Sequence, residues 1–256
     1  RWSGEENILV ECAAALCRSP VPSPDGTRLA YEIIPKQADA RPGIRLYHFR
    51  DQSTETVGSS SHYLDNPRWS STGWLSYYNH TEQQFVLWHP EKEQEITLAN
   101  QTGGPVSWDA EGRYFLFTEI YNLSDLLAPR HLLRFDLVRK NIVDLTQAGY
   151  YEDLNPAYAP EGEALAFTRK SLIPSEWIPG RQLTLLEDGG EALLQLTADI
   201  DFNHTSISWH PSGQRLAYVR HNQTQPSDPP EIWMINRDGT GKIRLVINGF
   251  APGWIP

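Results

Sequence analysis

The amino-acid sequence predicts an all-β fold, a β-propeller built from four-stranded blades. The first observation is a motif that occurs five times, in which an aromatic residue or proline leads into a turn of small residues. Each turn ends in a glycine, at Gly26, Gly73, Gly112, Gly162 and Gly213, so the period is about 40 to 50 residues. The second observation is a short apolar strand behind each turn, such as Leu29–Tyr31. This period, with several strands per unit, is typical of a propeller, in which no blade can bury its faces alone.

Each unit accommodates four strands, the first of which ends at the glycine turn. The expected strands after the turn are 29–34, 44–49 and 55–59 in the first unit, and 74–79, 85–89 and 95–99 in the second. They are 114–120, 131–137 and 141–145 in the third unit, 164–169, 182–187 and 192–196 in the fourth, and 215–220, 231–236 and 243–247 in the fifth. Apolar residues on both sides of these strands suit sheets packed between neighbouring blades.

Both ends of the chain carry partial repeats. Phe250–Trp254 resembles the opening strand of a sixth unit, and Asn7–Glu11 is expected to form one more strand. Because an open ring leaves exposed strand edges, we expect six blades, the last closed by both termini, with five blades as the alternative. The repeats leave no stretch for a second domain, so residues 1–256 are expected to form a single propeller domain.

The charge pattern excludes two classes of partner. The net charge is −10, and the 22 Lys and Arg residues are scattered rather than gathered in a stripe. Nucleic acid is therefore not expected as a partner, because its phosphates would meet no basic surface. The longest apolar runs are strand-sized, so direct insertion into a membrane is not expected either.

Two features bear on the cellular compartment. Cys12 and Cys17, the only cysteines, either form a local disulfide in a secreted protein or remain buried free thiols. Five Asn-x-Ser/Thr triplets fit the N-glycosylation pattern, at Asn79, Asn100, Asn122, Asn203 and Asn222. The alternative is that Asn and Thr simply occupy turns. The number of triplets favours an extracytoplasmic protein.

The blade motif resembles the propeller repeats of TolB-type proteins. Pro22–Tyr31 and Glu231–Gly241 carry the pattern best, and Trp209–Tyr218 follows it closely. The resemblance extends over nearly the whole chain from Arg18 onward, and the amino-terminal domain of TolB itself has no counterpart. It implies a periplasmic, secreted or cell-surface ring that binds or organises other molecules.

The long connections are expected on one face of the propeller. They are 35–43, 122–130, 170–181 and 222–230 after second strands, and 60–68, 147–157 and 198–206 before first strands. Strand direction alternates within a blade, so these loops open on one face and the short Asp-Gly turns on the other. Variable loops carry function in repeat folds. Trp177, between two prolines of the loop 170–181, is a candidate partner anchor, and covering its own blade is the alternative role.

Aromatic and polar residues precede the inner strand in three of the units. Together with Trp177, the candidate ligand or partner contacts are Tyr63, Asp65, Asn66, Arg68, Tyr151, Asp153, Asn155, Asp201, Asn203 and His204. We expect these positions around the mouth of a central channel, where rings beside carboxylates would suit a sugar, a cation or a basic peptide. The structural alternative is that Asp and Asn cap turns while the aromatic rings fill gaps between blades.

Catalytic motifs are missing from the sequence. It has no Gly-x-Ser-x-Gly elbow, and the eight His residues are dispersed rather than grouped as metal ligands. We therefore expect no enzymatic activity and no cofactor, with a Ca²⁺ ion at Asp65, Asp153 and Asp201 as the alternative.

The sequence favours a non-catalytic propeller that binds a protein or peptide through its long-loop face. One alternative is a lectin-like or glycoside-processing propeller that uses the acidic and aromatic channel mouth. The other is a structural subunit that assembles through its terminal blade.

Overall fold

The computed structural model describes residues 8–37, 39–120, 127–147, 149–160, 162, 164–187 and 193–254. All the regular elements within these ranges are β-strands, so the all-β prediction is confirmed. No helix in the described part of the chain is long and apolar enough to cross a membrane. The chain divides into two compact units, residues 1–69 with 75–98, and residues 70–74 with 99–256. The single-domain organisation of residues 1–256 stays a prediction.

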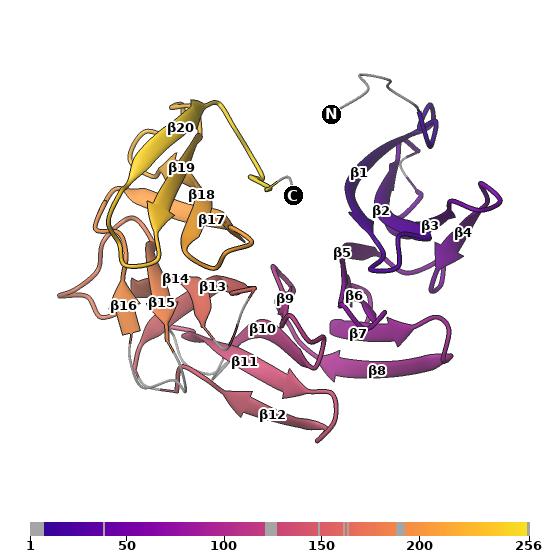
Figure 1. Ribbon diagram of the computed structural model, residues 1–256, viewed down its shortest axis with the longest axis horizontal. Coiled ribbons are helices and arrows are strands. Elements are labelled where there is room, and N and C mark those ends of the chain that lie inside the picture. The colour runs from indigo at the N-terminus through magenta and orange to yellow at the C-terminus, as the bar shows by residue number, and fades with distance from the viewer. Residues whose placement is uncertain are drawn as a thin grey trace. The chain divides into compact units, whose positions relative to one another are not determined.

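The first unit holds two four-stranded antiparallel sheets, blade 1 and blade 2 (Figure 1). Blade 1 consists of β1 (Ala15–Pro22), β2 (Arg28–Pro35), β3 (Gly43–His48) and β4 (Thr54–Val57). Blade 2 consists of β5 (Leu64–Trp69), β6 (Leu75–Asn79), β7 (Gln84–His89) and β8 (Gln94–Ala99). Ala30, Ile44 and Leu46 of blade 1 and Leu64, Leu75 and Tyr77 of blade 2 share one buried cluster. The two blades thus bury each other's apolar faces, as the repeat pattern requires.

The second unit holds three further blades. Blade 3 consists of β9 (Ser107–Trp108), β10 (Tyr114–Ile120), β11 (Arg130–Asp136) and β12 (Asn141–Asp144). Blade 4 consists of β13 (Tyr151–Tyr158), β14 (Leu165–Ser171), β15 (Gln182–Leu186) and β16 (Leu193–Gln195). Blade 5 consists of β17 (Phe202–Trp209), β18 (Arg215–Asn222), β19 (Glu231–Asn236) and β20 (Ile243–Ile247). A parallel pair between Arg130 and Glu152 joins blades 3 and 4.

Blade 4 packs on both of its faces. Leu165, Phe167 and Leu186 share a buried cluster with Leu116 and Leu132 of blade 3. On the opposite face, residues including Ala166, Leu183 and Leu185 share a second cluster with Trp209, Leu216, Tyr218 and Ile235 of blade 5. Adjacent residues of one strand therefore serve different neighbours, because side chains alternate between the faces of a sheet.

The repeated motif folds as the sequence predicts, as a tight turn between the first and second strands of a blade. In blade 1 the amide of Gly26 donates to the carbonyl of Ser23 at 3.0 Å, and in blade 5 Gly213 donates to His210 at 2.8 Å. All five motif glycines have positive φ, between 66° and 131°. Glycine adopts this backbone without the steric cost that a Cβ atom brings, which explains its place in each repeat.

A second recurring feature is a β-bulge within the inner strand. The pairing register shifts after Arg18, Asp65, Leu154 and Thr205 in four of the blades. Each shift contains one left-handed non-glycine residue, namely Ser19, Asn66, Asn155 or Ser206, with φ from 50° to 56°. The bulge lets the inner strand turn its end away from the regular ladder.

The ends of the chain differ from the prediction. Residues 8–11 form no strand, and Asn7 lies outside the described residues. Phe250–Trp254 forms no strand either, because it joins no described hydrogen-bonded ladder. Five four-stranded blades are described, so the six-blade count with a shared last blade stays a prediction.

Cys12 and Cys17 form a disulfide, with their Cα atoms 6.1 Å apart, which decides between the two alternatives left open for them.

Candidate ligand-binding site

A buried ion pair lies at the long-loop end of blade 4, the end of the sheet that carries the loop between β14 and β15. Asp153 of β13 is fully buried, and Nε and Nη2 of Arg169 on β14 each lie 2.7 Å from one of its carboxylate oxygens. Burial raises the pKa of Asp153, and the hydrogen bonds from Arg169 oppose that rise. The Arg169 guanidinium also lies over the Tyr151 ring, 4.5 Å from its centre. The pair thereby fixes both an aromatic ring and a cation at this end of the sheet.

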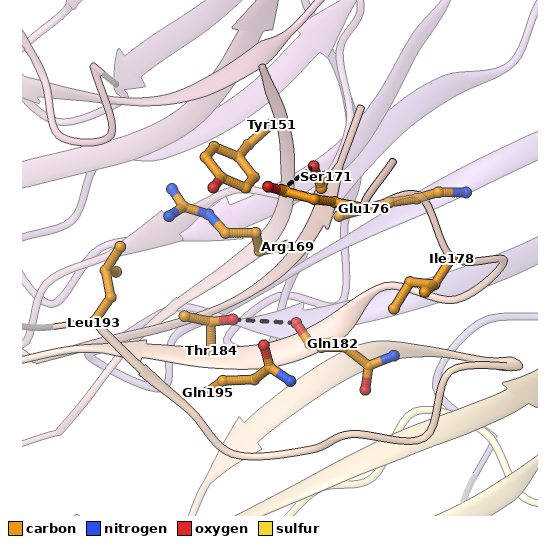
Figure 2. A pocket seen from close by; sticks show the side chains of 10 residues that line it. Tyr151, Arg169, Ser171, Glu176, Ile178, Gln182, Thr184, Leu193 and Gln195 are labelled. Atoms are coloured by element: carbon orange, nitrogen blue, oxygen red, sulfur yellow. Dashed lines mark hydrogen bonds between the residues drawn. The ribbon is translucent and has the colours of Figure 1, made fainter. Parts of the chain in front are cut away.

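Beside this pair lies a pocket of about 370 Å³ (Figure 2). Its lining comes from β13 to β16 and the loop after β14, with Tyr151, Arg169, Lys170, Ser171, Glu176, Ile178, Gln182, Thr184, Leu193 and Gln195. Both charge signs, hydroxyl and amide groups, and one aromatic ring are present. Such a lining offers hydrogen bonds and ion pairs to a polar ligand, while Tyr151, Ile178 and Leu193 add apolar contact.

The loop between β14 and β15 is tied to the pocket by its polar residues. Ser171 Oγ donates to Glu176 Oε2 at 3.0 Å, and Lys170 Nζ donates to the Pro179 carbonyl at 3.1 Å. Lys170 Nζ also lies 4.3 Å from the centre of the Trp177 ring. Burial lowers the pKa of Lys170, and the charge of Arg181 adds to this effect. Trp177 itself is 54% exposed, so the loop presents its ring to solvent beside the pocket.

A second polar cluster surrounds Asp199, just before β17. His204 is fully buried, and its Nδ1 lies 2.6 Å from the carbonyl oxygen of Arg181. Its Nε2 lies 3.6 Å from Asp199 Oδ2. Hydrogen bonding with His204, followed by that with Lys242, holds the pKa of Asp199 well below its usual range. Arg220 Nε lies 3.6 Å from the same carboxylate oxygen. These contacts anchor the start of blade 5.

The structure assigns several predicted contacts to structural roles. Asp153 and His204 are fully buried, which removes them from direct contact with a partner. Asn155 is a left-handed bulge residue whose amide donates to Thr168 Oγ1 at 3.1 Å, and Asn203 Oδ1 accepts from the Arg181 amide at 2.8 Å. Asp201 is half-buried, and its carbonyl accepts from the Gln223 amide. The contacts of Asp153, Asn155, Asn203 and His204 are those of the turn and packing interpretation, and a ligand contact at Asp201 stays a prediction.

The four predicted contacts of the first unit lie near a buried glutamate that the sequence did not single out. Glu32 accepts from Arg18 Nε at 2.6 Å and from the Asn66 amide at 3.0 Å. Burial lowers the pKa of Arg68, and the charge of Glu32 opposes this. The other two residues meet His80, which lies 2.8 Å from Asp65 Oδ2 and stacks on the Tyr63 ring at 4.0 Å. Tyr63 and Asp65 are half-buried.

The Asn-x-Ser/Thr triplets also have structural roles where they are described. Asn79 and Asn100 are buried, and their amide nitrogens lie 3.1 Å from His62 Nδ1 and 2.8 Å from the Thr118 carbonyl. A glycan on either nitrogen is incompatible with these contacts in the folded protein. Asn222 accepts from Thr224 and Gln225 in an Asx turn. Asn203 is half-buried, and Asn122 lies outside the described residues.

Several pocket residues escaped the sequence analysis. Arg169, Gln182, Thr184 and Gln195 lie on strands that the repeat pattern assigns to the blade core. The available signal was the alternation of polar Gln182 and Thr184 with apolar Leu183 and Leu185 along one strand. Alternation of this kind predicts one polar face, and that face lines the pocket.

As to metals, no group of three or more ligating side chains suited to an ion occurs within the described ranges.

Comparison with known proteins gives matches at the level of fold. No family model matches the chain, and no curated protein matches its sequence. TolB from Acinetobacter baumannii superimposes with a TM-score of 0.67 at 16% identity, over 90% of this chain and 54% of TolB. The chain therefore spans about half of the length of that protein.

Two other solved structures show the same architecture. An oligogalacturonate lyase in complex with manganese gives a TM-score of 0.67 at 16% identity, over 93% of this chain and 68% of the lyase. The β-propeller domain of the Trilobed protease from Pyrococcus furiosus, described as having an open velcro topology, gives 0.62 at 11% identity. This match covers 90% of the present chain and 71% of that domain. These matches confirm the β-propeller fold, and they support the TolB-type resemblance at the level of fold.

The expectation that the chain is not an enzyme was wrong. It rested on the absence of a known catalytic motif and on the resemblance to TolB-type repeats. The comparisons place oligogalacturonate lyases beside TolB among the structural neighbours, with equal TM-scores for the first of each. A propeller of this architecture therefore occurs in enzymes as well. At 16% identity the likeness shows the fold and assigns no reaction to this chain.

Proposed function

We propose that this chain is a TolB-like binding propeller that holds a protein or peptide partner at the long-loop end of blade 4. The observation that carries the proposal is Trp177, an exposed ring that Lys170 holds beside a polar pocket. Exposed tryptophans that insert into a partner are among the residues that contribute most to protein–protein affinity. The pocket supplies charged groups of both signs for the polar groups of a polypeptide.

A selection of peptides from a displayed library against the full chain tests this function. The selected peptides should lose about tenfold or more in affinity when Trp177→Ala is introduced, because Ala removes the anchor but leaves the pocket. Val138→Ala is the matched control, since Val138 is an apolar residue, 74% exposed, in the turn between β11 and β12. Equal losses in the two variants, or no selectable peptide, contradict the proposal.

A second candidate ligand is a saccharide, because Tyr151 places an aromatic ring among amide and hydroxyl groups in the pocket. Sugar rings pack their apolar faces on aromatic side chains and pair their hydroxyls with such polar groups. A glycan array probed with the full chain separates the two ligands. Glycan binding that is lost in Tyr151→Ala and retained in Trp177→Ala supports the saccharide and contradicts the peptide.

We also propose that the protein works outside the cytoplasm. The Cys12–Cys17 disulfide supports this, since disulfides persist in oxidising compartments and are rare in reducing ones. Maleimide labelling of the protein isolated from its native source provides the test. Labelling of both cysteines only after reduction is expected, and labelling without reduction contradicts the location.

A further inference from the structure

Three basic side chains converge on one carboxylate at the start of blade 4. Glu152, the second residue of β13, accepts from Arg181 Nε at 2.9 Å and from Arg181 Nη2 at the same oxygen. Nε of Arg130, which begins β11, lies 3.9 Å from the other oxygen. Lys170 of β14 is the cross-strand partner of Glu152 in the register. Three cations against one carboxylate leave two positive charges in excess.

This basic cluster of Arg130, Lys170 and Arg181 around Glu152 lies in a chain whose net charge is −10. Even when Glu176 of the adjoining loop is counted, one positive charge remains in excess. Burial lowers the pKa of Lys170, the charge of Arg181 lowers it further, and Glu152 opposes both. The ammonium group therefore has partly desolvated, electropositive surroundings. An anion that enters such surroundings is attracted more strongly than on an open surface.

Both guanidinium groups of the basic cluster keep donors for a ligand. The side chains of Arg130 and Arg181 are 33% and 23% exposed. Within the described part of the chain, the Arg130 guanidinium makes no hydrogen bond, and Arg181 uses only Nε and Nη2 toward Glu152. Arginine binds a carboxylate through two parallel N–H···O bonds, so each of the two residues is equipped to bind one.

The backbone of Arg181 is fixed against blade 5. Its amide donates to Asn203 Oδ1 at 2.8 Å, and its carbonyl accepts from His204 Nδ1 at 2.6 Å. Just before it, a Cβ atom on Gly180 would lie 2.1 Å from the carbonyl oxygen of Phe202, so the loop end is pressed onto the start of β17. A group held in place in this way loses less conformational freedom when a ligand binds.

Lys170 joins the basic cluster to the exposed ring of Trp177. Its Nζ lies 4.3 Å from the centre of that ring, and its backbone pairs with Glu152. The apolar anchor and the cations therefore belong to one surface. A partner that covers this surface needs an apolar residue and carboxylates close together.

We propose that the partner at the long-loop end of blade 4 is an acidic peptide, whose carboxylates bind Arg130 and Arg181 while an apolar residue packs on Trp177. This inference rests on the peptide-binding function proposed above and names the chemistry of the peptide. Side chains of Asp or Glu and a free C-terminus are the two sources of such a carboxylate.

The placement of the aromatic rings favours a peptide over an acidic saccharide. Tyr151, the ring suited to a sugar, lies with Arg169 on the pocket side of β13 (Figure 2). Glu152 is the next residue along the strand and faces the opposite side, because side chains alternate across a sheet. The sugar-stacking ring and the basic cluster are thus on different faces of the strand, whereas Trp177 adjoins the cluster through Lys170.

Two synthetic hexapeptides, acetylated and amidated, test the proposal by calorimetry with the full chain. One is Glu-Glu-Leu-Leu-Glu-Glu, and the other has Gln in place of every Glu. The acidic peptide should bind about tenfold or more tightly than the Gln peptide, and only its affinity should fall as salt is added.

Arg130→Gln should reduce the affinity for the acidic peptide about fivefold or more and leave that for the Gln peptide unchanged. Arg139→Gln is the matched control, because it removes the same charge from an arginine that is 73% exposed in the turn after β11. Equal affinities of the two peptides, or equal losses in the two variants, overturn the proposal.

Two further probes separate the sources of the carboxylate and the class of ligand. A Gln peptide with a free C-terminus that binds as tightly as the acidic peptide would assign the cluster to a chain terminus, and weaker binding would assign it to acidic side chains. Tighter binding of an oligomer of glucuronic acid than of the acidic peptide would overturn the choice of a peptide.

Failure of this inference is distinguishable from failure of the peptide-binding function. Equal binding of both hexapeptides that is lost in Trp177→Ala would retain the function and overturn only the acidic class. Binding of neither hexapeptide overturns the inference, and the library selection described above then decides whether the peptide-binding function fails with it.

Discussion

Asp153 shows how one buried residue can hold two lining residues of the candidate site, Arg169 and through it Tyr151, in place. Its carboxylate is fully buried against Arg169, so Asp153→Ala leaves a buried cation without its partner. We expect the free energy of unfolding in urea to fall by about 3–5 kcal/mol. The double variant Asp153→Leu/Arg169→Met should recover most of this loss, since it removes both charges and keeps the volume.

The control for that prediction is an exposed arginine beside Asp136, a buried carboxylate that keeps Arg113 as a partner at 2.7 Å. Arg139 is 73% exposed and lies 4.0 Å from Asp136. Arg139→Ala should change the free energy of unfolding by less than about 1 kcal/mol. A similarly small effect of Asp153→Ala would contradict the structural role assigned to the buried pair.

Asp199 makes the protein's stability depend on pH, and its contribution decreases as the pH falls. Its pKa is lowered in the folded protein by His204 and Lys242, so its contribution to stability is present above the unfolded value of about 3.9. That contribution is lost as the pH falls toward the lower folded value, because the unfolded state then binds the proton first. Asp199→Asn should therefore destabilise the protein most at pH 6 and less at pH 2.5, where the folded protein still holds the carboxylate ionised, as measured by urea unfolding. Asp201→Asn, two residues away, is the control, and an equal pH dependence in both would refute the assignment.

The sequence located part of the site and missed its chemistry. Tyr151, one of the predicted contacts, lines the pocket from the first residue of β13, and its role in binding a ligand stays a prediction. Asp153, two residues further on and on the same face of β13, is covered by Arg169, which is its cross-strand partner in the register. That pairing joins residues 16 apart, and no local pattern specifies it.

At the scale of the element, the repeat pattern defined the strands well. The expected ranges 114–120, 231–236 and 243–247 are those of β10, β19 and β20. Local alternation and turn chemistry suffice there because each strand is bounded by a turn. Local alternation and turn residues do not predict the bulges of the inner strands. Asn66 and Asn155 drew attention as polar residues near a site, whereas their left-handed backbone is what their positions require.

The bulge leads to a prediction about Asn155, whose φ is 54°. Asn155→Val and Asn155→Gly both remove the bond to Thr168 Oγ1, but only Val meets the steric cost of left-handed backbone. The Val variant should be less stable than the Gly variant by about 1–2 kcal/mol. Urea unfolding of the two proteins measures the difference, and equal stabilities would show that the bulge relaxes at no cost.

At the scale of the whole molecule, the repeats specified the architecture because each blade is stable only against a neighbour. The same repeats did not predict the function. Gly26 and Gly213 form the same turn in any blade, so the motif reports packing and turn geometry and carries no information on activity. That is the physical reason why a TolB and an oligogalacturonate lyase match this chain equally well.

Leu185 and Leu186 provide a test of how stability passes between blades. They are adjacent on β15, but Leu185 packs in the cluster shared with blade 5 and Leu186 in the cluster shared with blade 3. Each Leu→Ala change should cost about 2–5 kcal/mol, as is usual for buried leucines. Because repeat proteins couple through nearest neighbours, Leu185→Ala should reduce amide exchange protection in β18 and β19 more than in β10 and β11. Leu186→Ala should do the reverse. The same protection pattern in both variants would mean that the blades of this unit unfold together, without a directional interface.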